Sequence, residues 1–141
     1  MDAMPRSIHK DRNLARRAGA CLGGSALVAP VLIFFGLTIS SPGSNGRPDP
    51  SLLVVSVIVG VAFVTSFVAL TRIERGGVGP TKHLWKISLV SNLVIVLALT
   101  IVFGFAGLLL SIMEVIAIAF HVSALNMPPR IATEPSNRSD R

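Results

Sequence analysis

One long apolar stretch, residues 84–125, constrains this chain more than any other feature. Beyond Lys86 its only charged residue is Glu114, and His121 is the one other side chain that can gain a charge. As a single helix, the part from Ile87 onward would be about 58 Å long. That length is roughly twice the hydrocarbon thickness of a bilayer. Because the excess is too apolar to lie in water, the chain must fold back on itself.

The segment Gly104-Phe105-Ala106-Gly107 is the place where the sequence permits this reversal. Glycine tolerates the backbone angles of a tight turn and lets two helices approach closely. We therefore predict two transmembrane helices, at about 87–103 and 107–125, that form a tight hairpin with almost no loop between them.

Composition extends this prediction to the rest of the chain. Of its 141 residues, 51% are hydrophobic and 14% are charged, whereas soluble domains carry about 25% charged residues. The apolar residues form long uncharged blocks rather than alternating ten-residue segments, which favours helices over a β-barrel. The predicted fold class is an all-α membrane protein with four transmembrane helices, and the first two spans are about 20–40 and 51–71.

The remaining segments are short and polar. Residues 1–17 are predicted to be a basic cytoplasmic tail, and residues 126–141 a disordered cytoplasmic tail rich in Pro, Ser and Arg. The four-helix transmembrane domain between them covers 18–125. The apolar run after the basic tail is too long for a cleaved signal peptide, so we interpret it as an uncleaved anchor.

The distribution of basic residues predicts the orientation. Twelve of the 13 Lys and Arg residues lie in the two tails and in the connector 72–86, and Arg47 alone lies on the other side. The positive-inside rule then places both termini in the cytoplasm. We therefore predict a multi-pass protein of the plasma membrane. The arginine- and alanine-rich tails suit a bacterial source, and hence the bacterial inner membrane. The net charge of +6 thus predicts the lipid bilayer as a partner and no nucleic acid, since basic and aromatic residues are not interleaved.

Small residues recur in the first predicted span. Gly19 and Gly23 are four residues apart, as are Ala20 and Gly24. This spacing permits close contact between membrane helices. The sequence favours packing within the chain over a dedicated dimer motif.

Glu114 is the only carboxylate inside the predicted spans. An ionised carboxylate there costs several kcal/mol without a partner, so protonation or hydrogen bonding is expected. His121 lies two turns further along the same helix face, and hairpin closure brings Asn92 level with a point between them. We therefore predict a candidate intramembrane polar site of Glu114, Asn92 and His121. It is open whether this site titrates protons for transport or fixes helix rotation by hydrogen bonding.

The other reactive side chains do not form a recognisable set. The single cysteine, Cys21, excludes an intramolecular disulfide and a CxxC centre. The three histidines lack metal-ligand spacing. We predict no catalytic residue, no enzyme activity, no metal and no cofactor. The expected function is a non-catalytic structural or accessory subunit, associated with copies of itself or with another membrane protein. The alternative is an oligomeric proton-coupled small transporter or channel that uses Glu114.

Overall fold

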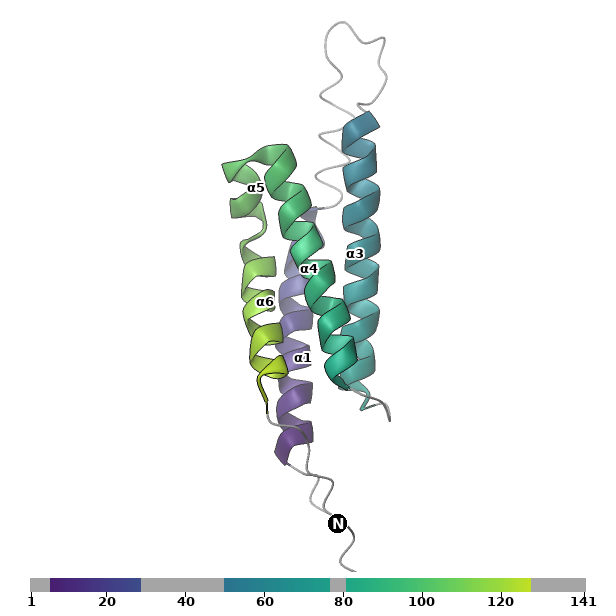
Figure 1. Cartoon of the computed structure of the whole chain (residues 1–141), viewed down its shortest axis with the longest axis vertical. Helices are drawn as coiled ribbons and strands as arrows, with labels where there is room; N and C mark the ends of the chain where they lie inside the picture. The colour runs from purple at the N-terminus through teal and green to yellow at the C-terminus, as the bar shows by residue number, and fades with distance from the viewer. Residues whose placement is uncertain (1–5, 29–49, 77–80, 128–141) are drawn as a thin grey trace, which may run out of the picture.

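The structure is a computed structural model that describes residues 6–28, 50–76 and 81–127, and within these ranges the secondary structure is helical with no strand. The predicted all-α class is therefore confirmed. Figure 1 shows the helices, which are α1 (Arg6–Ser25), α3 (Pro50–Glu74), α4 (Thr81–Phe103), α5 (Phe105–Leu110) and α6 (Ile112–Leu125).

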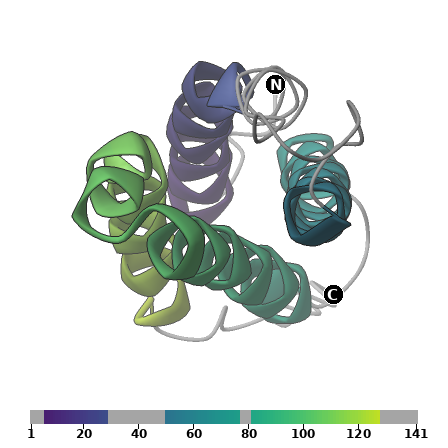
Figure 2. The same ribbon diagram turned by 90° about the horizontal axis from the view of Figure 1, so that it is seen from above.

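The helices form a bundle in which neighbours run in opposite directions. In Figure 1, α1 and α4 rise while α3 and α6 descend, and the short α5 lies above α6, beside the upper end of α4. Seen from above, the bundle is a ring: α1 contacts α3 and α6, and α4 contacts the same two helices (Figure 2). The start of α1 and the end of α6 therefore lie at the same end of the bundle, as expected for four antiparallel helices.

On each of α1, α3, α4 and α6, a narrow stripe of buried residues faces the bundle centre, and we call this stripe the seam of that helix. Most of the buried positions are three or four residues apart along each helix, which is the spacing of coiled-coil-like helix packing. They are Asp11, Ala15, Ala18, Leu22 and Ser25 in α1; Val59, Ala62, Ser66, Leu70 and Ile73 in α3; Trp85, Ser88, Asn92, Ile95 and Leu99 in α4; and Glu114, Ala117, His121 and Ala124 in α6. Ala69 and Ser91 are also buried, each next to one of these positions. Many of these side chains are small or polar.

Large apolar side chains, by contrast, cover the outside of the bundle. Val64, Ile101 and Phe105 are 65%, 74% and 75% exposed, and most exposed positions of α3, α4, α5 and α6 are likewise Val, Ile, Leu, Met or Phe. A soluble bundle has the opposite distribution. With 25 and 23 residues, α3 and α4 are long and apolar enough to cross a membrane, and α6 is a shorter apolar helix. Two of the four predicted spans thus have matching helices.

The first helix begins much earlier than the sequence suggested. Residues 6–17, predicted as part of a basic tail, are the first half of α1, and their buried side chains include Asp11 and Ala15. Lys10, Arg16 and Arg17 are exposed outside this seam, and Arg16 Nε donates to Glu74 Oε1 at 2.8 Å. Such a surface pair contributes about 0–1 kcal/mol, so packing of the alanine-rich seam is the main reason that this segment joins the bundle.

Parts of the predicted layout lie outside the described residues. These parts are residues 29–40 of the first span, nearly all of the loop that follows it, and the C-terminal tail from 128 onward. Within the described part of α1, a Cβ added to Gly19 or Gly23 would meet no atom of another element within 4 Å. The helix packs instead through Ala15, Ala18 and Leu22.

The chain reverses at the predicted glycine segment. Gly104 follows α4 with a φ of 57°, a conformation that glycine adopts without strain. A Cβ on Gly107 would overlap the carbonyl oxygen of Leu99, so α5 packs directly against the backbone of α4. The predicted helix 107–125 differs from the structure, because it is divided at Ser111. There Ser111 Oγ donates to Leu108 O at 3.0 Å, a local bond that competes with regular helix.

Candidate functional site

The bundle interior holds two groups of hydrogen-bonded polar side chains. The first, which we call the three-helix network, consists of Ser66 of α3, Ser88 and Asn92 of α4, and His121 of α6. Each of these four side chains is 0% exposed. They occupy the inward seams described above, so the same three-and-four spacing that packs the helices also brings the polar groups together.

The three-helix network is a continuous chain of short contacts. Asn92 Nδ2 donates to Ser66 Oγ at 2.9 Å and to the Ser88 carbonyl at 2.7 Å. Ser66 Oγ lies 2.7 Å from Ser88 Oγ, which lies 2.6 Å from His121 Nε2. His121 Nδ1 lies 2.5 Å from the carbonyl oxygen of Ala117.

Proton counting identifies the donor and the acceptor in each hydrogen bond of the three-helix network. A carbonyl oxygen can only accept, so His121 Nδ1 carries a proton and donates to Ala117. In the neutral imidazole Nε2 is then an acceptor, and Ser88 must donate to it. Ser66 in turn donates to Ser88 and accepts from Asn92. Every hydroxyl proton of the network is used in a bond between helices.

The imidazole of His121 also packs against the indole of Trp85. The two rings are 5.1 Å apart and nearly perpendicular, at 87°, an edge-to-face arrangement that favours aromatic pairs. Trp85 is 1% exposed. Its Nε1 and Asn92 Oδ1 are buried and have no hydrogen-bond partner within the described ranges.

The second group is the pair formed by Ser25 of α1 and Glu114 of α6. Ser25 Oγ forms a short hydrogen bond with Glu114 Oε1, and it also lies 3.0 Å from the Leu22 carbonyl. Glu114 is 0% exposed and Ser25 is 3% exposed. The other carboxylate oxygen, Oε2, has no hydrogen-bond partner in the part of the chain that the structure describes.

The structure places the three sequence-predicted residues in the interior but divides them. Asn92 and His121 belong to the same network, joined through Ser66 and Ser88, whereas Glu114 bonds to Ser25 on a different helix. Glu114 and His121 are seven residues apart, about 10.5 Å along the helix, which exceeds the reach of a direct hydrogen bond.

Sequence reasoning overlooked Ser25 and Ser66 as partners. The available signal was the three-and-four spacing, which places Ser66 on the same seam as Ala62 and Leu70. Ser25 follows Ala18 and Leu22 at the same spacing, but nothing local identifies its partner, which lies 89 residues away in the sequence.

Comparison with protein-family models, with curated proteins and with solved structures gives no match. Among the described residues, no group of three or more His, Cys, Asp or Glu side chains is arranged to hold a metal ion. The geometry of the site is therefore the basis for any function proposed for it.

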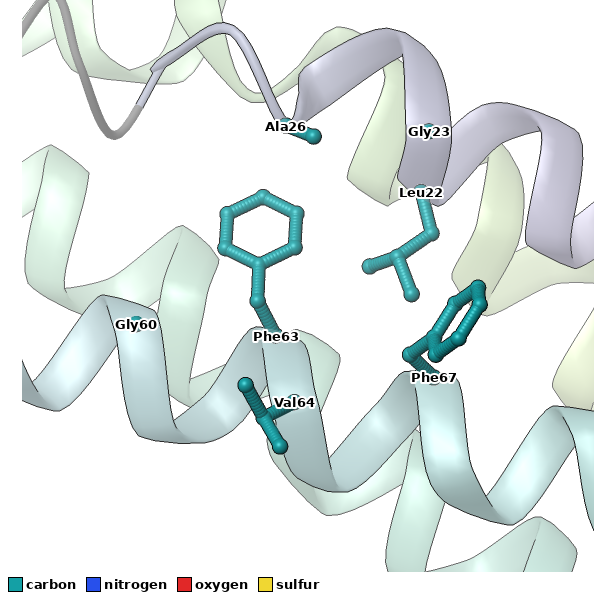
Figure 3. Close-up of a pocket in the computed structure, with 7 residues that line it drawn as sticks. All are labelled: Leu22, Gly23, Ala26, Gly60, Phe63, Val64 and Phe67. Carbon is teal, nitrogen blue, oxygen red and sulfur yellow. The ribbon is translucent and has the colours of Figure 1, made fainter.

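A separate apolar cavity of about 340 Å³ lies between α1 and α3 (Figure 3). Phe63 extends from α3 toward Ala26, and Leu22 extends from α1 toward Phe67. Its full lining is Leu22, Gly23, Ala26, Gly60, Phe63, Val64 and Phe67. None of these side chains is polar, so the cavity offers a ligand no hydrogen bond that would fix its orientation.

Proposed function

We propose that the protein is a small multi-pass membrane protein that serves as a non-catalytic structural or accessory subunit of a membrane assembly. The observation that carries this proposal is the inverted bundle, with large apolar side chains outside and hydrogen-bonded polar side chains inside. Membrane helices associate through small residues and interhelical hydrogen bonds, because in lipid there is no hydrophobic driving force for helix association.

The membrane placement has four spans in this proposal. They are α3, α4, the segment 20–40, and α5 together with α6, which cover residues 105–125 and so have about the length that crosses a bilayer. The start of α1 and the end of α6 share one end of the bundle, which agrees with both termini in the cytoplasm of a bacterial inner membrane.

The polar interior supports a structural role better than a catalytic one. Ser88 and His121 have the 2.6 Å spacing of a nucleophile and its base. Both side chains are nevertheless 0% exposed, and Ser88 is already bonded to Ser66. A nucleophile must contact its substrate, whereas Ser88 and His121 are buried and hydrogen-bonded within the three-helix network. Their bonds join α3 to α4 and α4 to α6, while Ser25 and Glu114 join α1 to α6.

Assembly is the property that tests this function directly. We expect the full chain, extracted in a mild detergent, to migrate at a mass above that of one 14.9 kDa chain plus its micelle, as a homo-oligomer or with another membrane protein. Sedimentation with density matching measures this mass. A strict monomer that co-purifies with no other membrane protein, in detergent and in lipid nanodiscs, would contradict the proposal.

A second candidate function is an oligomeric proton-coupled transporter or channel. The specific observation in its favour is Glu114, a buried carboxylate with one oxygen unpartnered among the described residues. Buried acids of this kind mark proton and substrate pathways in membrane proteins.

Glu114→Gln separates the two candidates. Glutamine keeps a group that can hydrogen-bond to Ser25 but cannot release a proton. For a structural subunit we expect a change in unfolding free energy below about 1 kcal/mol and proton flux into proteoliposomes equal to that of empty liposomes for both chains. Flux that is present in the wild type and absent in Glu114→Gln, at equal protein abundance, would favour the transporter.

A further inference from the structure

A groove runs along the outer face between α3 and α4. It shares the lining residue Val64 with the cavity of Figure 3. It consists of two cavities, of about 300 and 340 Å³, that meet at Thr65. On α3 the lining residues are adjacent pairs that recur every three or four positions, and they face a matching stripe on α4. The α3 stripe includes Val57, Val61, Thr65, Val68 and Arg72, and the α4 stripe is Leu84, Ile87, Val90, Ser91 and Val94.

The groove exists because its floor is made of small residues. Ala62 and Ala69 of α3 and Ser91 of α4 are 7%, 3% and 8% exposed. The valines on either side, such as Val61 and Val68, stand outward and form the walls. Apart from Arg72, the lining offers only apolar surface and hydroxyl groups. Thr65 and Ser91 already donate to backbone carbonyls of their own helices, at 2.8 and 3.0 Å.

A cationic side chain closes one end of the groove. Arg72 lies where α3 ends and α4 begins, next to Leu84 and Ile87. Every charged residue of α3 and α4 lies at this end: Arg72 and Glu74 in α3, and Lys82 and Lys86 in α4. Glu74 is paired with Arg16 of α1. The excess charge at the mouth of the groove is therefore positive.

The groove is also about as long as one lipid leaflet is thick. Val57 and Arg72 are 15 residues apart, which corresponds to about 22 Å along a helix. Half of a bilayer, including its headgroup region, is about 20–22 Å thick. A phospholipid with its phosphate at Arg72 would thus extend its acyl chain along the whole apolar floor.

We propose that this groove binds one anionic phospholipid, with the phosphate at Arg72 and an acyl chain along the groove between α3 and α4. The proposal depends on the membrane placement proposed above. Arginine suits this role because its guanidinium forms paired hydrogen bonds with phosphate. The positive end of the bundle selects a headgroup with net negative charge over a zwitterionic one.

Native mass spectrometry of the full chain, with phosphatidylglycerol or phosphatidylcholine added to the detergent, tests the proposal. For the wild type we expect one phosphatidylglycerol per chain, bound more tightly than phosphatidylcholine. Arg72→Gln should weaken phosphatidylglycerol binding about fivefold, the effect of one basic residue at an anionic surface. Arg75→Gln is the matched control, because it removes the same charge at the same helix end but does not line the groove.

A second pair of variants tests the acyl-chain path. Thr65→Phe replaces an exposed side chain with a ring at the point where the two cavities meet, and it should abolish lipid binding. Val54→Phe adds a ring at another exposed position of α3, and it should leave binding unchanged. Helical content and melting temperature, measured by circular dichroism, verify that each variant is folded.

Three results would overturn the proposal. One is undiminished phosphatidylglycerol binding by Thr65→Phe, and another is an equal loss in Arg72→Gln and Arg75→Gln. The third is a change in oligomer mass in Thr65→Phe with lipid binding intact, which would assign the groove to a second copy of the chain. If the chain instead stays soluble without detergent and binds neither lipid, the membrane placement itself has failed.

Discussion

Replacing Gly107 by alanine is expected to lower the free energy of unfolding by about 3 kcal/mol or more. The added Cβ would overlap Leu99 O, and it would lie 2.5 Å from Leu99 C and 3.0 Å from Thr100 N. These are backbone atoms of α4 and cannot rotate away as a flexible side chain would. Either α5 must move off α4, or the hairpin must open. Unfolding in detergent, followed by circular dichroism as a denaturant is added, measures the loss.

Gly60→Ala is the control for this prediction. Gly60 lies inside α3, and an added Cβ has no atom within 4 Å, so alanine should be neutral or should stabilise the helix by up to about 1 kcal/mol. A Gly107→Ala variant as stable as the Gly60→Ala variant would show that α5 does not pack against α4 as closely as described.

Replacing His121 by alanine is expected to destabilise the bundle by about 2–4 kcal/mol. The change leaves a cavity in the seam, removes the edge-to-face contact with Trp85 and leaves the Ser88 hydroxyl without its acceptor. The same unfolding measurement applies. His83→Ala is the control: His83 is exposed near the start of α4, and its loss should change stability by less than about 0.5 kcal/mol.

A double-mutant cycle with Ser88→Ala tests whether the bond itself contributes. Hydrogen bonds between membrane helices contribute about 0.6 kcal/mol on average and at most about 1.7 kcal/mol. The losses in His121→Ala and Ser88→Ala should therefore fail to add by an amount in this range. Strictly additive losses would mean that His121 stabilises the bundle through packing alone.

The helical hairpin is the part of the fold that was most predictable. Reversal at 104–107 followed from two local facts, the length of the apolar stretch and the glycines within it, and neither depends on the rest of the chain. The seam residues were predictable in principle as well. Ser88 and Asn92, followed by Ile95 and Leu99, recur at three-and-four spacing, but hydropathy alone hides this pattern because nearly every position between them is also apolar.

Helix boundaries were less predictable. The start of α1 at Arg6 depends on the seam that Ala15 and Ala18 form against α3 and α6. Without α3 and α6 this seam has no packing partner, so the basic segment is not expected to form a helix by itself. Two contacts accompany the division at Ser111: a local side-chain bond, and the close packing of α5 against α4. Only the first of these is visible in the sequence.

The sequence by itself determined that the chain is helical, where it reverses and which acid is buried, because apolar content, glycine and charge act locally. Tertiary structure alone decided which polar groups bond to one another. Glu114 pairs with Ser25 and Asn92 joins Ser66, across separations of 89 and 26 residues. The physical reason is that a hydrogen bond needs its atoms within about 3 Å, and helix rotation and relative height set that distance.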